Sequence, residues 1–152
     1  MQRILRALLV IGLLAGGLAN AAAAERGTAE EARAMVARAI ALYREKGAAE
    51  AFATMNRPDG GFRDHDLYIF VYGLDRKVVV QAADATRIGL DADSVRDVDG
   101  KYYGKESLAA ATPQGVWVDY RRANPATGQI EQKSSWLVRV DGYVFGCGIY
   151  KP

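Results

Sequence analysis

The spacing of apolar residues changes once along this chain, near Pro58, and that change limits the folds open to it. Upstream of Pro58 the apolar residues recur three and four positions apart, which is the spacing of one face of an α-helix. They are Ala32, Met35, Val36, Ala39, Ile40 and Tyr43. Thr28 and Glu31 have the spacing of a capping box, in which each side chain satisfies a backbone amide of the other residue. The pattern predicts a long amphipathic helix that ends near Gly47 and then a short helix over residues 48–55.

Downstream of Pro58 the pattern is typical of β-strands. Residues 67–72 and 77–81 are rich in β-branched and aromatic side chains and are separated by a short turn, which predicts a β-hairpin. Turn residues also bound three later segments with strand patterns, residues 116–121, 134–140 and 143–150. Because hairpin connections make neighbouring strands antiparallel, these segments predict one antiparallel sheet.

A long segment interrupts the strands. Residues 82–100 are predicted to be a loop, and residues 103–111 a short helix. The N-terminal helix must bury its apolar side on one face of the sheet, and the long loop can cover part of the other face. The predicted fold class is therefore α+β, a helix packed on an antiparallel sheet, with space for a pocket between the sheet and the loop.

Residues 1–24 have the pattern of a signal peptide. Arg3 and Arg6 precede an apolar run over residues 7–18, and a run of alanines ends at Ala24. The apolar run is shorter than the roughly 20 residues that a membrane span needs, and a short membrane anchor is the alternative. We expect cleavage after Ala24, one mature domain over residues 25–152, and a periplasmic or secreted destination.

The composition of the mature segment excludes some functions. Without Arg3 and Arg6 it holds 18 basic and 18 acidic residues, so it has no excess charge that would attract nucleic acid. Cys147 is the single cysteine of the chain, so no disulfide can form within it and the fold must depend on its apolar core. Because Cys147 lies in an apolar segment, we interpret it as a small buried side chain rather than a nucleophile.

Residues that could support catalysis or metal binding are few. His65 is the single histidine, and Asp64 and Asp66 on either side of it cannot both reach its ring from a strand. The acidic stretch from Asp91 to Asp99 lacks the spacing and the terminal glutamate of a calcium loop. One histidine and one cysteine make no zinc site, and no glycine-rich phosphate loop is present. We therefore expect no enzyme activity, no metal and no cofactor; the alternative is a small hydrolase that uses His65 with a carboxylate.

Aromatic and polar side chains alternate along the strands, as in a small-molecule pocket. Tyr68 and Tyr72 share a face by the strand period of two, and Gln81 ends the next strand. Lys133 and Ser135 share a face of a later strand, and an ammonium group with hydroxyl donors suits a carboxylate. The alternative is an ordinary amphipathic sheet with its aromatics in the core and Lys133 in solvent.

Seven stretches of the chain, in order, resemble the single Cache domain of the second type. They are residues 67–72 (LYIFVY), 81–89, 97–101 (DVDGK), 115–120 (GVWVDY), 124–128 (NPATG), 133–136 (KSSW) and 146–150 (GCGIY), and the resemblance extends over about residues 29–151. It implies a PAS-like fold in which a long N-terminal helix packs on a five- to six-stranded antiparallel sheet with a ligand cavity on the other side. It also implies an extracytoplasmic sensing domain of chemoreceptors and histidine kinases, with small organic acids such as acetate, propionate, pyruvate or lactate as ligands.

Two features depart from that family. Its members commonly have a histidine at the end of the second strand, eight positions before the glycine that Gly89 matches, where this chain has Gln81. A glutamine side chain donates and accepts hydrogen bonds but never carries a positive charge, so we expect a different ligand or weaker binding. The chain also ends at Pro152 without a following transmembrane helix or signalling domain, so we expect a stand-alone exported domain.

Together these features predict a non-catalytic binding module for a small polar metabolite, expected to be an organic acid, held between the sheet and the loop of residues 82–100. The predicted contacts are the walls Tyr68, Trp117 and Trp136 and the polar groups Gln81, Tyr103, Lys133 and Ser135, with Lys133 as the charge partner. In a regular strand Trp117 and Tyr120 point to opposite faces, as do Trp136 and Ser135, so only a bulge would let both members of a pair line the pocket.

An interaction protein without a ligand is the alternative function. Such a protein would dock on a membrane sensor kinase, a chemoreceptor or a transporter through its N-terminal helix. The same helix is the expected contact of a homodimer, because sensory domains of the resembled family often dimerise.

Overall fold

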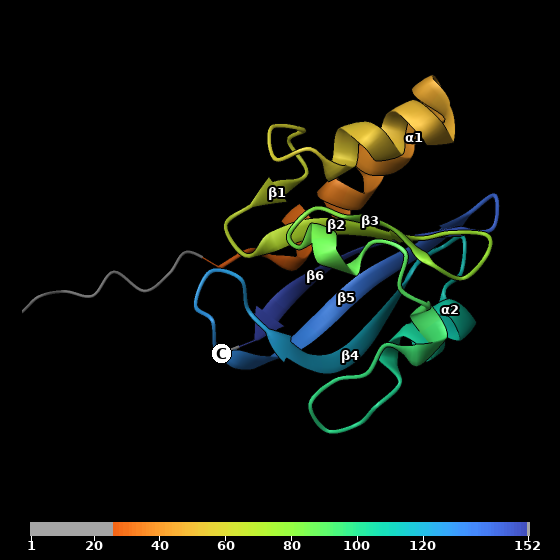
Figure 1. Cartoon of the computed structure of the whole chain (residues 1–152). Coiled ribbons are helices and arrows are strands. Elements are labelled where there is room, and N and C mark those ends of the chain that lie inside the picture. The colour runs from red at the N-terminus through yellow and green to blue at the C-terminus, as the bar shows by residue number, and fades with distance from the viewer. Residues whose placement is uncertain (1–25, 152) are drawn as a thin grey trace, which may run out of the picture.

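The computed structural model describes residues 26–151, and the predicted signal peptide, residues 1–24, lies outside them. Within the described range the chain forms a six-stranded antiparallel sheet with helices on both faces (Figure 1). The strands are β1 (Arg63–Asp64), β2 (Leu67–Tyr72), β3 (Val78–Gln81), β4 (Val116–Ala123), β5 (Ile130–Val140) and β6 (Tyr143–Lys151). Their order is β1-β2-β6-β5-β4, and β3 also pairs with β2. The last strand in sequence therefore lies inside the sheet, where it joins the β2–β3 hairpin to the β4–β5 hairpin.

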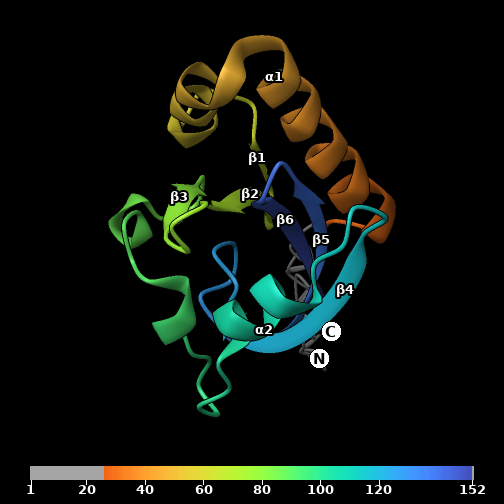
Figure 2. The ribbon, with the colours of Figure 1, turned by 90° about the vertical axis from the view of Figure 1, so that its right-hand side faces the viewer.

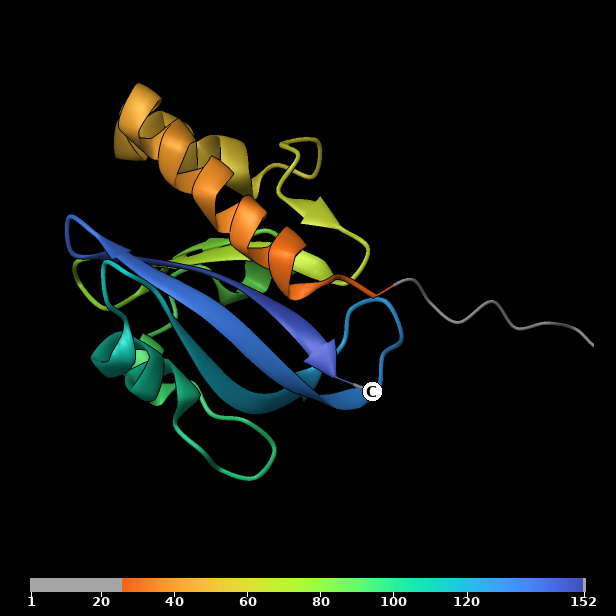
Figure 3. The same cartoon turned by 180° about the vertical axis from the view of Figure 1, so that it is seen from behind.

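The helix α1 (Ala29–Asn56) crosses one face of the sheet (Figure 3). The predicted capping box is present, because the Thr28 hydroxyl accepts from the Glu31 amide and the Glu31 carboxylate accepts from the Thr28 amide. At Gly47 the backbone leaves the helical conformation, with φ 75° and ψ 170°. Glycine takes this conformation without the steric cost of a Cβ. The prediction of two helical pieces that meet near Gly47 is confirmed, and Figure 2 shows the sharp bend between them.

Between α1 and the sheet lies an apolar core. Met35, Val36 and Ala39 of α1 pack against side chains of β2 and β6, which include Ile69 and Phe145. Phe145 is fully buried, and burial of one such side chain stabilises the fold by roughly 1.5–3 kcal/mol. This core fixes α1 on the sheet and leaves the opposite face free to carry other chemistry.

The opposite face of the sheet carries a second core, rich in tyrosine. It is covered by α2 (Tyr103–Ala110) and by two short 3-10 turns, η1 (Ala85–Arg87) and η2 (Ala92–Ser94), which belong to the connection between β3 and α2 (Figure 2). Its buried tyrosines are Tyr68, Tyr72, Tyr103, Tyr120 and Tyr150. The predicted long loop and short helix are therefore confirmed as the cover of this face.

Two features of the sheet differ from the sequence prediction. β5 begins at Ile130, four residues before the predicted start at Ser134, because Glu131 and Gln132 pair with β4 although they are polar. β1 was not predicted, since two exposed residues paired with β2 leave no pattern in the sequence. The remaining predicted strands are confirmed with boundaries that differ by one or two residues.

Candidate functional site

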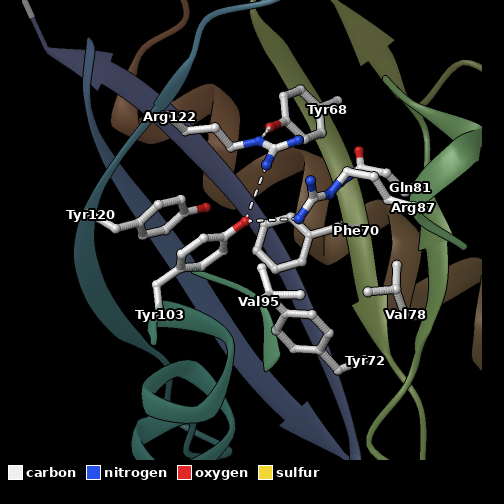
Figure 4. Close-up of a pocket in the computed structure, with 10 residues that line it drawn as sticks. All are labelled: Tyr68, Phe70, Tyr72, Val78, Gln81, Arg87, Val95, Tyr103, Tyr120 and Arg122. Carbon is white, nitrogen blue, oxygen red and sulfur yellow. Dashed lines mark hydrogen bonds between the residues drawn. The ribbon is translucent and has the colours of Figure 1, made fainter. Parts of the chain in front are cut away.

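A pocket lies on the tyrosine-rich face of the sheet, between β2, β4 and the connection from β3 to α2 (Figure 4). We call it the tyrosine pocket, and its lining residues are Tyr68, Phe70, Tyr72, Val78, Gln81, Arg87, Val95, Tyr103, Tyr120 and Arg122. Its cavity volume is about 20 Å³, which is enough for about one water molecule. Side chains of the protein therefore fill most of the space between the sheet and α2.

Two glycines of β6 make the floor beneath these side chains. Gly146 and Gly148 alternate along the strand and so face the same side of the sheet. A Cβ on Gly146 would run into the ring of Phe70, and a Cβ on Gly148 would run into the side chains of Lys133 and Ser135. Because β6 contributes no side chain at these two positions, side chains from β2 and β5 can lie across it.

Two arginines enter the pocket from opposite sides. Arg122 of β4 donates through Nε to the Tyr68 hydroxyl at 3.1 Å and through Nη1 to the Tyr103 hydroxyl at 3.1 Å. Arg87, at the end of η1, donates through Nη2 to the same Tyr103 hydroxyl at 3.2 Å (Figure 4). Within residues 26–151 neither guanidinium group forms an ion pair with a carboxylate, and their hydrogen bonds in the pocket go to tyrosine hydroxyls. Asp84 is the nearby carboxylate, and the charges of Arg87 and Arg122 help to lower its pKa.

A third cation, Lys133, is buried beneath Tyr68. Its side chain is inaccessible to solvent, and its ammonium nitrogen lies 3.7 Å from the centroid of the Tyr68 ring and 4.8 Å from that of Tyr150. No group in the described part of the chain accepts a well-aligned hydrogen bond from this nitrogen, although the Tyr68 hydroxyl is close enough to favour its charged form. Burial lowers the pKa of Lys133, because a charged ammonium group loses its hydration there.

Tyr68 titrates differently from the tyrosines around it. Burial raises the pKa of Tyr72, Tyr120 and Tyr150. Burial also acts to raise the pKa of Tyr68, but the positive charges of Lys133 and Arg122 outweigh it and lower that pKa to about 8. The two cations beside Tyr68 therefore favour negative charge at this point of the pocket.

Tyr120 lines the pocket beside the arginines, and Ser135 lies behind it. Their hydroxyl oxygens are 2.8 Å apart, and both side chains are buried. The Tyr120 ring stacks on that of Tyr103, with centroids 4.1 Å apart and planes 3° from parallel. This contact connects β4 to the first residue of α2.

Gln81 lies at the end of β3, where the sequence places it, and lines the tyrosine pocket. Its backbone amide donates to the side chain of Asn56 at the end of α1, and its own side-chain oxygen accepts from the Ala83 amide. The side-chain NH₂ group makes no hydrogen bond to a described residue and can donate to a ligand. Gln81 carries no positive charge, but Arg87, which also lines the tyrosine pocket, does.

Three of the seven predicted contact residues line the pocket, namely Tyr68, Gln81 and Tyr103. Lys133 and Ser135 lie one layer deeper, where they contact the lining residues Tyr68 and Tyr120. The prediction that Trp117 and Trp136 form walls is wrong, because both pack on the α1 face of the sheet. The two strands are regular where they pair, so the period of two directs these rings away from the pocket and toward Arg33 of α1, which lies 4.7 Å from the Trp136 ring centroid.

Sequence reasoning missed Arg87 and Arg122. Val118, Tyr120 and Arg122 are two positions apart and share one face of β4, so the tyrosine and the arginine could have been assigned to the pocket together. The sequence prediction instead places Trp117 in the pocket, although it lies on the opposite face of β4. Arg87 lies in an irregular segment, where periodicity carries no information about direction.

Other sites considered in the sequence show no supporting geometry. Between Arg26 and Lys151 no cluster of three His, Cys, Asp or Glu side chains could hold a metal ion. Cys147 is buried, and burial raises the pKa of its thiol to about 12, so it is not an activated nucleophile. His65 is in the turn between β1 and β2, beside Asp64, and does not line the tyrosine pocket. Over the described residues no helix combines the length and the apolar character required to span a bilayer.

Two curated sensory proteins are similar to part of this chain. The sensor histidine kinase MctS of Rhizobium johnstonii is 34% identical over 87 residues, which are 56% of this chain and 19% of the kinase. The methyl-accepting chemotaxis protein McpP of Pseudomonas putida is 30% identical over 90 residues, which are 57% of this chain and 16% of the receptor. The aligned part is thus less than a fifth of either relative.

Solved structures share the fold. A methyl-accepting chemotaxis protein from Vibrio parahaemolyticus superposes with a TM-score of 0.66 at 15% identity, over 80% of this chain and 86% of that one. A structure described as "Structural basis for carboxylic acid recognition by a Cache chemosensory domain" has a TM-score of 0.59 at 17% identity, over 81% and 88% of the two chains. The periplasmic sensor domain of a chemotaxis protein also has a TM-score of 0.59, at 22% identity, over 81% of this chain and 90% of that domain.

These likenesses confirm the predicted fold class, in which a long N-terminal helix packs on an antiparallel sheet of the Cache type. The family model described as Single Cache domain 2 matches residues 18–150, which is most of the chain. Sensor kinases and chemoreceptors contain related domains. This chain therefore belongs to the Single Cache domain 2 family.

Proposed function

We propose that this protein is a non-catalytic binding module that holds a small organic acid in the tyrosine pocket. The observation that carries the proposal is the set of three cations, Arg87, Arg122 and Lys133, none of which forms an ion pair with a carboxylate among residues 26–151. A buried or half-buried charge without a partner is costly to the fold. The negative charge of an anionic ligand would offset the charges of these cations and lower the electrostatic cost of burying them.

The walls of the pocket suit an acid with a short apolar part. Arg122 and Arg87 present guanidinium donors, which match the two oxygens of a carboxylate. Gln81 adds an amide donor on the β3 side. Phe70, Val78 and the other apolar lining residues can contact a chain of one or two carbon atoms.

The size of the pocket restricts the ligand. A cavity of about 20 Å³ cannot take even acetate without movement of side chains, so only an acid of a few heavy atoms is plausible in size. We propose acetate, propionate, lactate and pyruvate as the set to test. A gain of about 1.5 kcal/mol per heavy atom at most limits acetate to a Kd of roughly 40 μM and lactate or pyruvate to roughly 0.3 μM at the tightest.

The comparisons support a carboxylate ligand by analogy. A solved Cache chemosensory domain with the same fold is described by its recognition of carboxylic acids. We also propose that residues 1–24 are a cleaved signal peptide and that residues 25–152 work as one domain in the periplasm or outside the cell. Mass spectrometry of the exported protein should find Glu25 at the N-terminus; an intact leader in the exported fraction would contradict this.

Calorimetry and thermal shift with the four acids test the binding function. The wild type should bind at least one of them, with a rise in Tm that grows with the logarithm of ligand concentration. Arg122→Gln should weaken binding by roughly 10- to 100-fold, because a charge-assisted hydrogen bond is lost. Arg44→Gln, an exposed residue of α1 with the same charge change, is the matched control and should bind as the wild type does. No response to any acid, in calorimetry and in Tm, would refute the proposal.

The alternative function, docking on a sensor or transporter partner, predicts self-association or partner capture instead of ligand binding. One observation favours it: Ala37 and Ala41 on the exposed side of α1 border a groove that also includes Val138 and Val140. We propose a second copy of the chain as the occupant, with α1 as the contact. Light scattering after gel filtration should then give twice the monomer mass, and Ala41→Glu should restore the monomer. A monomer at high concentration would exclude this contact.

A further inference from the structure

Two arginine side chains converge on the same neutral oxygen. Arg87 and Arg122 both donate to the hydroxyl of Tyr103, at 3.2 Å and 3.1 Å (Figure 4). A carboxylate accepts from two guanidinium groups more strongly than a phenol does, because it has two oxygens and a negative charge. The Tyr103 hydroxyl therefore occupies the position in the pocket that best suits the carboxylate of a ligand.

Tyr103 also separates the tyrosine pocket from a second hollow. This outer groove, about 190 Å³ in volume, is lined by Arg96, Val98 and Arg121 among others. Tyr103 and Arg122 line both spaces, so their side chains form the wall between them. Rotation of the Tyr103 ring into the outer groove would join the two spaces and enlarge the small inner cavity.

The backbone around Tyr103 is held in place, which leaves the side chain as the part that can move. A Cβ on Gly104 would run into the carbonyl oxygen of Ala92, so the start of α2 is packed closely on η2. At the other end of α2, Arg139 of β5 donates to the carbonyl oxygens of Leu108 and Ala111. The Tyr103 ring stacks in parallel on Tyr120, and this is the aromatic contact that the ring must leave when its side chain rotates.

We propose that Tyr103 is a gate whose hydroxyl is displaced by the ligand. The carboxylate takes both hydrogen bonds from Arg87 and Arg122, and the phenol ring swings into the outer groove, through which the ligand arrives. This inference rests on the proposed function. It adds that the Tyr103 hydroxyl competes with the ligand for the hydrogen bonds of Arg87 and Arg122. It explains how a pocket of about 20 Å³ admits a molecule larger than water.

Tyr103→Phe tests the gate because it removes the competing hydroxyl and keeps the ring. The variant should bind propionate about two- to tenfold more tightly than the wild type by calorimetry, which is the value of a typical hydrogen bond. Tyr102→Phe is the matched control, since Tyr102 is exposed and does not line the pocket, and it should not change affinity. Binding that is tenfold weaker in Tyr103→Phe would show that Tyr103 donates to the ligand, and unchanged binding would show that its hydroxyl does not compete; either result overturns the gate.

A crystal structure of the wild type with propionate gives an independent test that needs no variant. The carboxylate should lie within hydrogen-bond distance of both Arg87 and Arg122, with the Tyr103 ring in the outer groove. A complex in which Tyr103 still accepts from both arginines would reject the gate but leave the binding function standing. Absence of binding of every acid tested, to the wild type and to Tyr103→Phe, would reject both proposals, so the two failures can be told apart.

Discussion

At the scale of single residues, the buried charge of Lys133 links the stability of the protein to the proposed binding of an anion. Its ammonium group is fully buried over the Tyr68 ring and has no well-aligned hydrogen-bond acceptor among the described residues. The cation–π contact recovers part of the lost hydration free energy, but a carboxylate would recover more. The buried charge thus destabilises the protein alone and favours the protein with an anion bound.

Replacement of this charge should separate the two effects. We expect Lys133→Met to raise Tm by several degrees, because exchange of a buried charge for an apolar side chain of similar length is commonly stabilising by about 1–4 kcal/mol. The same variant should bind propionate at least about tenfold more weakly. Lys151→Met removes an exposed lysine whose partner is Asp119 and should change neither quantity much. A fall in Tm for Lys133→Met would show that Lys133 has a neutralising partner in solution.

The charge of the pocket should also make binding depend on pH. The positive charge of Lys133 lowers the pKa of Tyr68 to about 8, so a rise in pH removes one proton from this pair and lowers its net positive charge. This change opposes a carboxylate, and affinity for propionate should therefore fall as pH rises through about 8. Calorimetry between pH 6.5 and 9.5 measures this, and Tyr68→Phe should weaken the dependence. Affinity that is constant over this range would contradict it.

The side chains of the candidate site differ in how well the sequence defines the face of the sheet toward which they point. The strand period of two indicates the face of Tyr68, and the end of a strand, where the resembled family commonly has a histidine, indicates Gln81; no periodicity defines the direction of Tyr103. The tryptophans were misassigned because a bulky aromatic ring suits a pocket wall and a helix interface equally well. Arg122 was passed over because an arginine in an exposed-looking Arg-Arg pair gives no sign that one member is half-buried.

At the scale of elements, local signals in the sequence were sufficient for α1, for the β2–β3 hairpin and for the last strand. A capping box, a glycine at the bend and a turn of four residues each define a boundary by chemistry that acts within a few residues. The pairing order β1-β2-β6-β5-β4 depends on contacts between distant segments, and no short-range signal encodes it. The resemblance to a family implies the layers, a long helix on an antiparallel sheet, but not this order of strands.

An ionic network joins the segment ahead of α1 to the β4–β5 hairpin. Arg26, ahead of α1, pairs with Glu131 of β5 at 2.5 Å, and Asn124 and Thr127 of the β4–β5 turn donate to the same carboxylate. These contacts, the Arg26 hydrogen bond foremost, lower the pKa of Glu131 to about 2. The network fastens the start of the domain to the end of the β4–β5 hairpin.

This network should contribute to stability above about pH 4.5 and lose its contribution as pH falls toward about 2. The sign follows from the carboxylate: its pKa is lower in the folded protein than the ordinary value of 4.5, so the unfolded chain takes up the proton first. Urea unfolding between pH 2.5 and 7 should therefore show a steeper acid loss in the wild type than in Glu131→Gln. Equal slopes would show that the carboxylate is not paired in solution.

At the scale of the whole molecule, one sheet separates two cores of different character. The α1 side is apolar and closely packed, while the α2 side combines tyrosines with arginines and a buried lysine. Figure 2 shows the two covers, α1 and the segment from η1 to α2, on opposite sides of the strands. The first core can maintain the fold while the second changes its contacts.

Ligand binding should therefore be visible on one side of the sheet before the other. With saturating propionate, amide hydrogen exchange should slow in residues 82–110, which contain Arg87 and Tyr103, because local opening of that cover must break contacts with the bound acid. Residues 29–46 of α1 face the apolar core and should exchange at nearly the same rate with and without the acid, at short times that precede global unfolding. Arg122→Gln at the same propionate concentration should lose the protection. Equal protection of both covers would mean that the sheet transmits the ligand's effect to α1, and the separation of the two cores would not hold.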